Sequence, residues 1–337
     1  MLYPEIRVYC SQPTKIAEKD DILLSVRAPV GPTNLAPCRV CIGRGLTAIR
    51  PSEKLMLKYL LYFFRYFEAQ LQQKGTGTTF KAITQDIIKN LEVPVPAIPE
   101  QERIVARIEE LFSQLDSGVE TLKKIKRQLA VYRQAVLKEA FEGIGTYIAF
   151  GQITDSRLGK MLDKEKNTGI SRKYLRNINV RWFSFDMSDL LEMRIEDEEV
   201  DKYSIRYDDL VICEGGEPGR CAVWEKEYTI FYQKALHRVR FLDKSNPKFY
   251  MYYLWFSAQS GQLSKYFTGT GIKHLTGQSL AKVPVPTTER TRQDSIVAEI
   301  EGKLSVCDSI EKTVDTALQQ AEAMRQSILK KAFEGGL

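Results

Sequence analysis

Apolar residues recur at alternating steps of four and three through residues 98–141 of the chain. They are Ile104, Ile108, Leu111, Leu115, Leu122, Ile125, Leu129, Tyr132 and Val136, with a gap at Gly118. This spacing gives a narrow apolar seam, which is typical of a coiled-coil helix and differs from the broader stripe of a globular helix. The sequence therefore predicts one long helix from Ile98 to Phe141.

The same pattern returns 192 residues later in the same register. The ten equivalent positions, nine of them apolar, are Ile296, Ile300, Lys303, Cys307, Ile310, Val314, Ala317, Ala321, Met324 and Ile328. Val-Pro-Val-Pro precedes both helices, at 93–96 and 283–286. Alternate prolines exclude a helix and a central strand, so each stretch is expected to be a rigid extended lead-in. We interpret the chain as two copies of one module, each a globular domain followed by a long helix.

The two globular domains share a plan. The first is predicted to contain strands at Ile6–Tyr9, Asp21–Val26 and Arg39–Ile49 and an aromatic helix at Lys54–Gln73. The second is predicted to contain a strand at 208–212, a turn at Gly215–Arg220 and an aromatic helix at Phe249–Phe256. A Gly-Thr-Gly loop follows each helix, at 75–77 and 269–271. We expect both aromatic faces to lie in the cores.

The second domain contains an additional segment, roughly 153–188, with no counterpart in the first. The first domain is therefore expected to start about forty residues late, because the strand anchors differ by 188 and Met1 lies opposite Asp189. Either this domain is truncated at its N-terminus or the segment comes from elsewhere.

Helix geometry restricts the architecture. Some forty residues at about 1.5 Å each span roughly 60 Å, and the second domain connects the end of the first helix to the start of the second. Antiparallel packing brings both connections to one end, which predicts an α+β dumbbell with an internal pseudo-twofold repeat. We expect domains at 1–97 and 146–287, and spacer helices at 98–145 and 288–337.

The net positive charge lies in the globular parts, which carry +8, whereas the helical segments carry −2. Residues 1–97 and 146–287 together contain 34 basic and 26 acidic side chains, whereas the helical segments contain 15 and 17. A phosphate-binding surface is therefore expected on the domains. The six cysteines include one Cys38-x-x-Cys41 pair without a second pair at zinc spacing, so buried free thiols on strands in a reducing cytoplasm are expected. No signal peptide or membrane span is predicted.

Sequence motifs for catalysis are absent. The chain contains no phosphate-binding GxxxxGK[ST] loop, no GxGxxG after a strand, no HExxH and no nucleophile elbow. The two histidines are expected to be structural or at the surface. The run Glu196–Glu199 is expected to be a solvated charge run rather than a metal site. We predict no catalytic residues, no metal and no cofactor.

A basic segment at 160–181 is the stronger candidate site. It contains Lys160, Lys164, Lys166, Arg172, Lys173, Arg176 and Arg181, interleaved with Tyr174, Asn177 and Asn179. Such donors and amides bind phosphates and base edges. The acidic run that follows would have to face away from DNA. From the basic segment we predict DNA contacts by Lys173, Tyr174, Arg176, Asn177 and Asn179. From the loops we add Arg27, Thr78, Arg220, Lys273 and His274. The alternatives are a merely solvated basic face and, for Asn177 and Asn179, the closing of a turn.

The whole arrangement resembles the specificity subunit of type I restriction-modification systems. The resemblance rests on Val93–Pro96 with Ile98-Pro99-Glu100-Gln101-Glu102-Arg103-Ile104, the long helix, Lys138–Gly143, and the second copy of all three. The second copy departs from the Pro-Glu-Gln lead-in, with Glu289-Arg290-Thr291-Arg292-Gln293 in its place.

That resemblance implies two target-recognition domains separated by antiparallel helices that form a coiled-coil spacer. Each domain would recognise half of a split sequence in double-stranded DNA. It also implies docking of two methyltransferase subunits and a restriction subunit, no catalysis by the chain itself, and no membrane. The competing hypothesis is a coiled-coil adaptor that binds only proteins.

Overall fold

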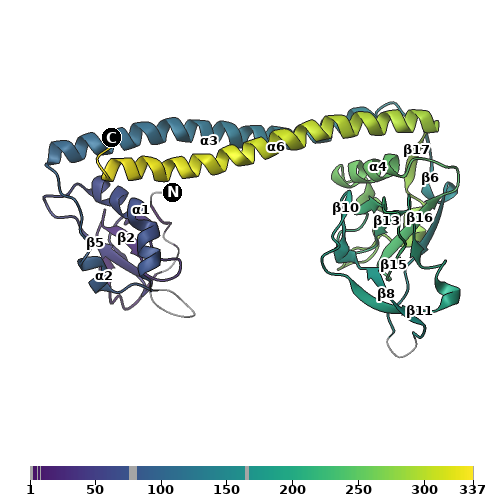
Figure 1. Ribbon diagram of the computed structural model, residues 1–337, viewed down its shortest axis with the longest axis horizontal. Helices are drawn as coiled ribbons and strands as arrows, with labels where there is room; N and C mark the ends of the chain where they lie inside the picture. Colours follow the sequence, from purple (N-terminus) through teal and green to yellow (C-terminus); the bar gives the residue numbers. More distant parts are fainter. Residues whose placement is uncertain (1–2, 6, 8, 76–81, 164–166, 337) are drawn as a thin grey trace. The chain divides into compact units, whose positions relative to one another are not determined.

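The computed structural model describes residues 3–5, 7, 9–75, 82–163 and 167–336, which divide into two compact units (Figure 1). The first unit comprises residues 1–126 and 312–337, and the second comprises residues 127–311. Both contain helices and strands. Two 44-residue helices, α3 (Ile98–Phe141) and α6 (Arg290–Phe333), each contribute residues to both units. The predicted bounds of the first long helix are confirmed.

The first unit is built on a small antiparallel sheet with the order β3-β2-β5. Its strands are β2 (Ile22–Ser25), β3 (Thr33–Leu35) and β5 (Leu46–Ile49), and a separate ladder joins β1 (Ile16–Ala17) to β4 (Val40–Cys41). The predicted strand at 21–26 is confirmed. The predicted region 39–49 is divided between β4 and β5. Of the predicted strand at 6–9, Arg7 and Tyr9 belong to no strand, and the other two residues lie outside the described ranges.

The aromatic helix α1 (Leu57–Lys74) forms the core of the first unit, as expected. Its buried face contains Leu60, Leu61, Phe63, Phe64 and Leu71, which pack with Ile22, Leu24 and Leu35 of the sheet. Tyr59 and Tyr62 instead pack with the long helices, in a cluster with Ile104, Ile108 and Leu329. A short helix, α2 (Gln85–Lys89), precedes the extended lead-in to α3.

The second unit contains two four-stranded sheets. One has the order β14-β13-β16-β7, from β7 (Thr154–Leu158), β13 (Leu210–Cys213), β14 (Cys221–Val223) and β16 (Leu236–Phe241). The other has the order β11-β8-β15-β12, from β8 (Ile170–Leu175), β11 (Leu191–Ile195), β12 (Ser204–Ile205) and β15 (Ile230–Tyr232). All pairs are antiparallel except β15 with β8. Two further pairs join β9 (Val180–Arg181) to β10 (Ser184–Phe185) and β6 (Thr146–Ala149) to β17 (Pro284–Thr287).

The helix α4 (Pro247–Gln259) covers the first of these sheets and confirms the second predicted aromatic helix. Phe249, Tyr250 and Tyr253 are buried in a cluster with Leu210 and Val239 of the sheet. The short helix α5 (Gly277–Ala281) follows. The alternating prolines of residues 283–286 place β17 at the edge of a two-stranded pair, where missing N–H donors are tolerated.

Within each unit, the segments of α3 and α6 run antiparallel. In the second unit Arg133 contacts Asp308 at 2.7 Å and Glu311 at 2.8 Å. In the first unit Arg325 pairs with Asp116. The neighbouring seam positions Tyr132 and Met324 were predicted to be in the apolar seam, but they are 49% and 54% exposed. That part of the prediction is wrong, because each arginine takes the inward position with its ion pair.

A buried glutamine connects each long helix to its own domain. In the first unit Gln101 accepts from the N–H of Met56 at 2.8 Å and donates to the carbonyls of Lys54 and Pro96. In the second unit Gln293 accepts from the N–H of Asn246 at 2.7 Å and donates to the carbonyl of Thr288 at 3.0 Å. The second helix therefore retains the glutamine of the lead-in although the preceding residues differ.

The cysteine prediction is correct for only part of the set. Cys213 and Cys221 are buried on strands as expected, Cys307 is buried on the helix α6, and Cys10, Cys38 and Cys41 are exposed free thiols. The Cys38-x-x-Cys41 pair spans the start of β4, whose ladder with β1 leaves those side chains uncovered. Among the described residues, no helix is both long and apolar enough to cross a membrane.

Candidate nucleic-acid interface

Three of the predicted residues come together around one turn of the second unit. The turn 214–220 joins β13 to β14 and is closed by backbone hydrogen bonds between Cys213 and both Gly219 and Arg220. Asn177 donates from Nδ2 to the carbonyl of Gly215 at 2.5 Å, and Arg220 donates from Nη2 to the carbonyl of Asn177 at 3.0 Å. These contacts bring segments more than thirty residues apart in the sequence to one place.

His274 completes this group from a third segment. Its backbone pairs with Thr268 in both directions, which closes the loop 268–274, and the N–H of Leu275 donates to the carbonyl of Glu214. A Cβ at Gly215 would lie 3.0 Å from Nδ1 of His274. At Gly216, which has a φ of +72°, a Cβ would lie 2.8 Å from Nδ2 of Asn177. Glycine is required there because the backbone is left-handed and the amide approaches closely.

Lys273 and Ile272 occupy the tip of the same loop. Lys273 is exposed, and its Nζ donates to the carbonyl of Gly269 at 2.9 Å. Ile272 is 73% exposed. The interface thus presents a cation, an amide and an imidazole around a glycine turn, which is the donor chemistry that binds phosphates and base edges.

Arg176 lies next to this group, but its guanidinium is bound internally. Its Nη2 donates to Oδ2 of Asp189 at 2.5 Å and to the backbone carbonyl of Asp189 at 3.0 Å. Asn179 is 1% exposed and accepts from the N–H of Arg176, while it donates to the carbonyls of Asp186 and Asp189. Asn179 therefore closes a turn, and we omit it from the proposed contact set.

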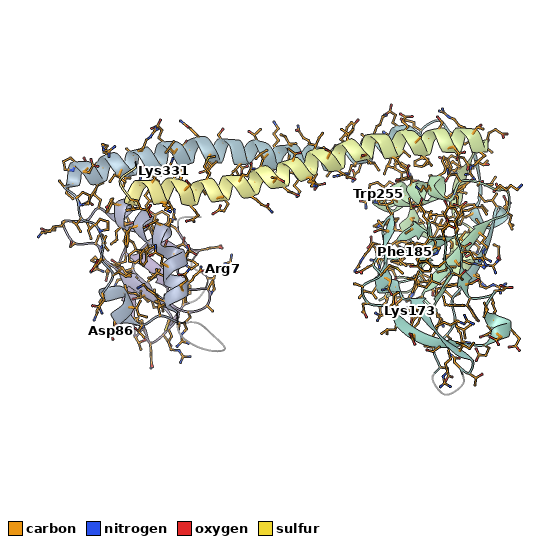
Figure 2. All side chains as sticks on the ribbon, viewed as in Figure 1. Arg7, Asp86, Lys173, Phe185, Trp255 and Lys331 are labelled. Atoms are coloured by element: carbon orange, nitrogen blue, oxygen red, sulfur yellow. The ribbon has the colours of Figure 1, made fainter. Side chains whose placement is uncertain are left out.

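Tyr174 was also a predicted contact, and the structure places it in a core. It is 3% exposed and packs with Met193, Ile195 and Phe231. The reason is strand alternation, since side chains on β8 point to opposite faces of the sheet. Lys173 is therefore exposed, and Figure 2 shows it on the part of the second unit away from α6.

Part of the basic segment forms ion pairs with acidic residues that follow it. Lys160 is buried and pairs with Glu196 and Glu199, while Arg172 and Arg181 approach Asp197 and Asp186 at 3.9 and 3.6 Å. The hydrogen bonds from Lys160 and from the N–H of Thr168 lower the pKa of Glu196. The expectation of a solvated acidic run is therefore wrong for Glu196 and Glu199. Lys164 and Lys166 lie outside the described residues.

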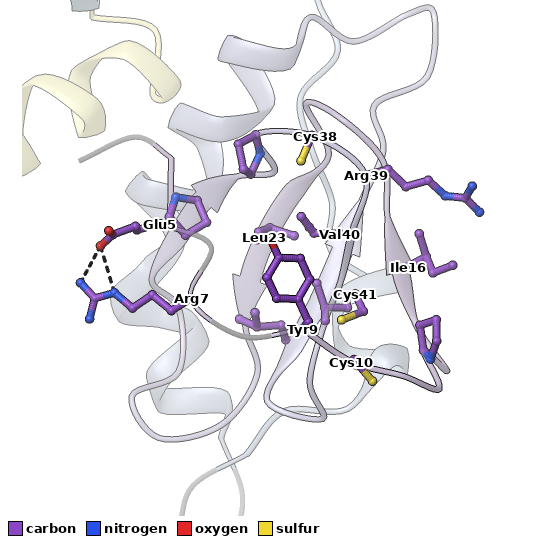
Figure 3. A pocket seen from close by; sticks show the side chains of 15 residues that line it. Glu5, Arg7, Tyr9, Cys10, Ile16, Leu23, Cys38, Arg39, Val40 and Cys41 are labelled. Atoms are coloured by element: carbon purple, nitrogen blue, oxygen red, sulfur yellow. Dashed lines mark hydrogen bonds and ion pairs between the residues drawn. The ribbon is translucent and has the colours of Figure 1, made fainter.

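The remaining predicted residues belong to the first unit. Arg27 is exposed and forms an isolated β-bridge with Ala82. Thr78 lies outside the described residues. The same unit contains an open cavity of about 910 Å³ lined by Tyr9, Leu23, Val40 and the three exposed cysteines (Figure 3). Across the described part of the chain, no group of three or more His, Cys, Asp or Glu side chains is placed to hold a metal ion.

Two carboxylates that contact the candidate residues were not predicted from the sequence. Glu217 accepts from Arg220 at 3.0 Å and from Nε1 of Trp182 at 2.7 Å, and Asp189 binds Arg176 as described above. The spacing of three between Glu217 and Arg220 was the available signal. No spacing rule indicates the contact between Asp189 and Arg176, because it depends on how β8 and β11 pair.

A family model described as type I restriction modification DNA specificity domain matches residues 8–129. The EcoKI specificity subunit of Escherichia coli K12 is 22% identical over 324 residues, which cover 89% of this chain and 70% of that protein. A putative MjaX specificity subunit of Methanocaldococcus jannaschii is 34% identical over 143 residues, which cover 42% of this chain and 33% of that protein. The match thus spans about a third of the archaeal relative.

Two solved structures share the fold over 97% of the chain. One, from a study of assembly and conformational transition of a type I R-M system, has a TM-score of 0.81 with 19% identity and 85% of its own length covered. The other, the HsdS subunit of Thermoanaerobacter tengcongensis, has a TM-score of 0.62 with 20% identity and 84% covered.

Proposed function

We propose that the chain is a member of the family of type I restriction-modification specificity subunits, and that it recognises a DNA sequence and positions a DNA methyltransferase there. The observation that supports this most directly is the convergence of Asn177, Arg220 and His274 on one glycine turn. Separate sequence segments meeting at donor-rich loops are what base recognition requires.

We assign the contacts of the second domain by their chemistry. Arg176 and Arg220 would bind guanine O6 and N7, and Asn177 would bind adenine, because these are the side chains that fit those edges. Lys173, Lys273 and His274 would bind phosphates and fix the register on the duplex. In the first domain, Arg27 and Thr78 are the corresponding candidates. Which bases are recognised depends on the loop geometry in the complex.

We further propose that the chain is an internal repeat with domains at 1–97 and 146–287 and coiled-coil spacer helices at 98–145 and 288–337. Several contacts recur at positions shifted by 192 residues, which supports this. Gln101 and Gln293 are buried with equivalent partners, and the pair Arg133–Asp308 is equivalent to the pair Arg325–Asp116. Each domain would recognise one half of a bipartite site.

The proposed partners are double-stranded DNA, two methyltransferase subunits and a restriction subunit. The named relatives are specificity subunits of type I restriction enzymes, which supports this assignment. The chain itself would not be catalytic, consistent with the absence of the nucleotide-binding and hydrolase motifs from its sequence. The adaptor hypothesis is less favoured, because it does not explain the donor cluster on the second domain.

Methylation-site sequencing of cells with and without the gene tests the proposal. We expect one bipartite methylated motif to disappear on deletion and to return when the gene is restored. Arg220→Ala and Asn177→Ala should each relax one position of that motif, because each removes one base contact. A methylome that does not change on deletion would instead support the adaptor.

The spacer has a separate test. Seven residues inserted after both Gln128 and Gln320 would preserve the seam and add roughly 10 Å. We expect unchanged half-sites with a spacer longer by a few base pairs, since DNA rises about 3.4 Å per base pair. An insertion in only one helix is the control and should damage assembly. If the complex with the paired insertion is active and its DNA motif has an unaltered spacer, the helices do not set the distance between the half-sites.

A further inference from the structure

Both arginines of the candidate interface are held by carboxylates of their own domain. Nη1 of Arg220 contacts Oε2 of Glu217 at 3.0 Å, and Nη2 of Arg176 contacts Oδ2 of Asp189 at 2.5 Å. The arginine side chains are 15% and 22% exposed, whereas the carboxylate side chains are 52% and 65% exposed. A polyanion that approaches this surface therefore meets the carboxylates before it meets the guanidinium groups.

The hydrogen bonding of this region is incomplete. Nε of Arg176, Nε of Arg220 and Oδ1 of Asn177 are buried and have no hydrogen-bond partner among the described residues. Buried polar groups in folded proteins are normally paired, so these three atoms require an explanation. The two guanidinium groups retain donor capacity that the free protein does not use.

Both acidic residues make further hydrogen bonds within the second unit. Glu217 accepts a hydrogen bond from Nε1 of Trp182 at 2.7 Å through its other oxygen. The backbone carbonyl of Asp189 accepts from both Arg176 and the buried Asn179. These are therefore not simply two mobile surface side chains near a cation.

We propose that Glu217 and Asp189 are specificity-determining residues that suppress binding to non-cognate DNA. A carboxylate presents to a guanidinium the same paired oxygens as a phosphate, so it occupies the arginine that would otherwise neutralise the backbone. Non-specific affinity comes from such neutralisation. At a cognate site, guanine provides two acceptors in place of the carboxylate. This inference rests on the proposed function.

The test compares Glu217→Gln and Asp189→Asn with the wild-type chain in its methyltransferase complex. Both substitutions keep an oxygen acceptor, so the hydrogen bond from Trp182 to residue 217 can persist. The probes are a duplex with the methylated motif found in cells and a scrambled duplex of equal length and composition. Glu227→Gln is the matched control, because Glu227 is an exposed carboxylate of the same unit with no ion pair to a described residue.

We expect Glu217→Gln and Asp189→Asn each to bind the scrambled duplex about two- to fivefold more tightly than the wild type, which is the range for ion pairs of this exposure. The slope of log K against log salt should steepen by about 0.9 for each released arginine. Affinity for the cognate duplex should rise less, so the specificity ratio falls, while Glu227→Gln leaves that ratio unchanged. An unchanged far-UV circular dichroism spectrum of the variant chain would show that it remains folded.

Two results would overturn the inference. If Glu217→Gln or Asp189→Asn loses affinity for the cognate duplex without gaining affinity for the scrambled duplex, the carboxylate contacts a base or supports the loop. If neither affinity changes, the ion pairs do not limit DNA binding. Failure of the proposed function is recognised separately, because the wild-type complex would then show no preference between the two duplexes.

Discussion

Replacing Gln293 with leucine should destabilise the second unit selectively. Gln293 is 2% exposed and is the acceptor for the N–H of Asn246, the N-cap residue of α4. It also donates to the carbonyl of Thr288 at 3.0 Å and, at 3.3 Å, to the hydroxyl of Ser245. Leucine has a similar volume but forms none of these hydrogen bonds.

The magnitude follows from the groups left without partners. The N–H of Asn246 and the carbonyl of Thr288, which belong to half-buried residues, would lose their partners, at about 1–3 kcal/mol for each group that water does not reach. We therefore expect the free energy of unfolding of the second unit to fall by roughly 1–4 kcal/mol. Ser245→Ala removes only the longest of the three contacts and should cost less than about 1 kcal/mol.

The tryptophans allow this effect to be assigned to one unit. Trp182, Trp224 and Trp255 all lie between residues 127 and 311, so tryptophan fluorescence in a urea titration monitors the second unit alone. Far-UV circular dichroism monitors both units. Gln293→Leu should shift the fluorescence midpoint, because it removes hydrogen bonds in the monitored unit.

Gln101→Leu is the matched control, since Gln101 has equivalent contacts in the first unit. It should shift a transition seen by circular dichroism and leave the fluorescence midpoint unchanged. The reasoning is refuted if Gln293→Leu changes the stability of the second unit by less than about 0.5 kcal/mol, the level of an ordinary surface substitution.

Three further predictions concern a pH-dependent ion pair, the thiols and the DNA contacts. The hydrogen bond from Arg50 lowers the pKa of Asp21, whose side chain is 5% exposed, below its unfolded value. The stabilisation is therefore present above about pH 4 and lost as the pH falls through the folded pKa. Asp21→Asn should flatten this dependence in urea titrations of the first unit, and an equally steep dependence in the variant would contradict it. Burial raises the pKa of Cys213 to about 11 and raises that of Cys221 well above its usual value, so iodoacetamide at mild alkaline pH should label Cys10, Cys38 and Cys41 first. Mass spectrometry that finds Cys213 labelled at a comparable rate would oppose this. Asn177→Ala should weaken cognate binding by about 1–3 kcal/mol, whereas Tyr174→Phe should change it by less than about 0.5 kcal/mol. Equal losses in a binding titration would argue against the assignment.

Local pattern was sufficient for the long helices. The bounds of α3 follow from the sequence because a helix is specified by residues three and four apart, which lie next to each other on its surface. The aromatic helices were predictable for the same reason, whereas the strand at 22–25 was predictable as a short apolar run that ends in a turn. The exposure of Tyr132 and Met324 was not, because inward positions depend on which residues the partner helix presents, here Asp308 and Asp116.

The candidate interface was only partly determined by the sequence. Composition identified Asn177, Arg220 and His274, and their presence on separate loops is a property of the sequence itself. Only the tertiary structure decided that they meet, because the turn after β13, the segment after β8 and the loop 268–274 are joined by long-range hydrogen bonds. The antiparallel pairing of β8 with β11 likewise brings Glu196 of the acidic run next to Lys160, and the Asp189 carboxylate next to Arg176. A charge count along the chain cannot distinguish cations available to DNA from cations already neutralised, since that depends on where the chain folds back.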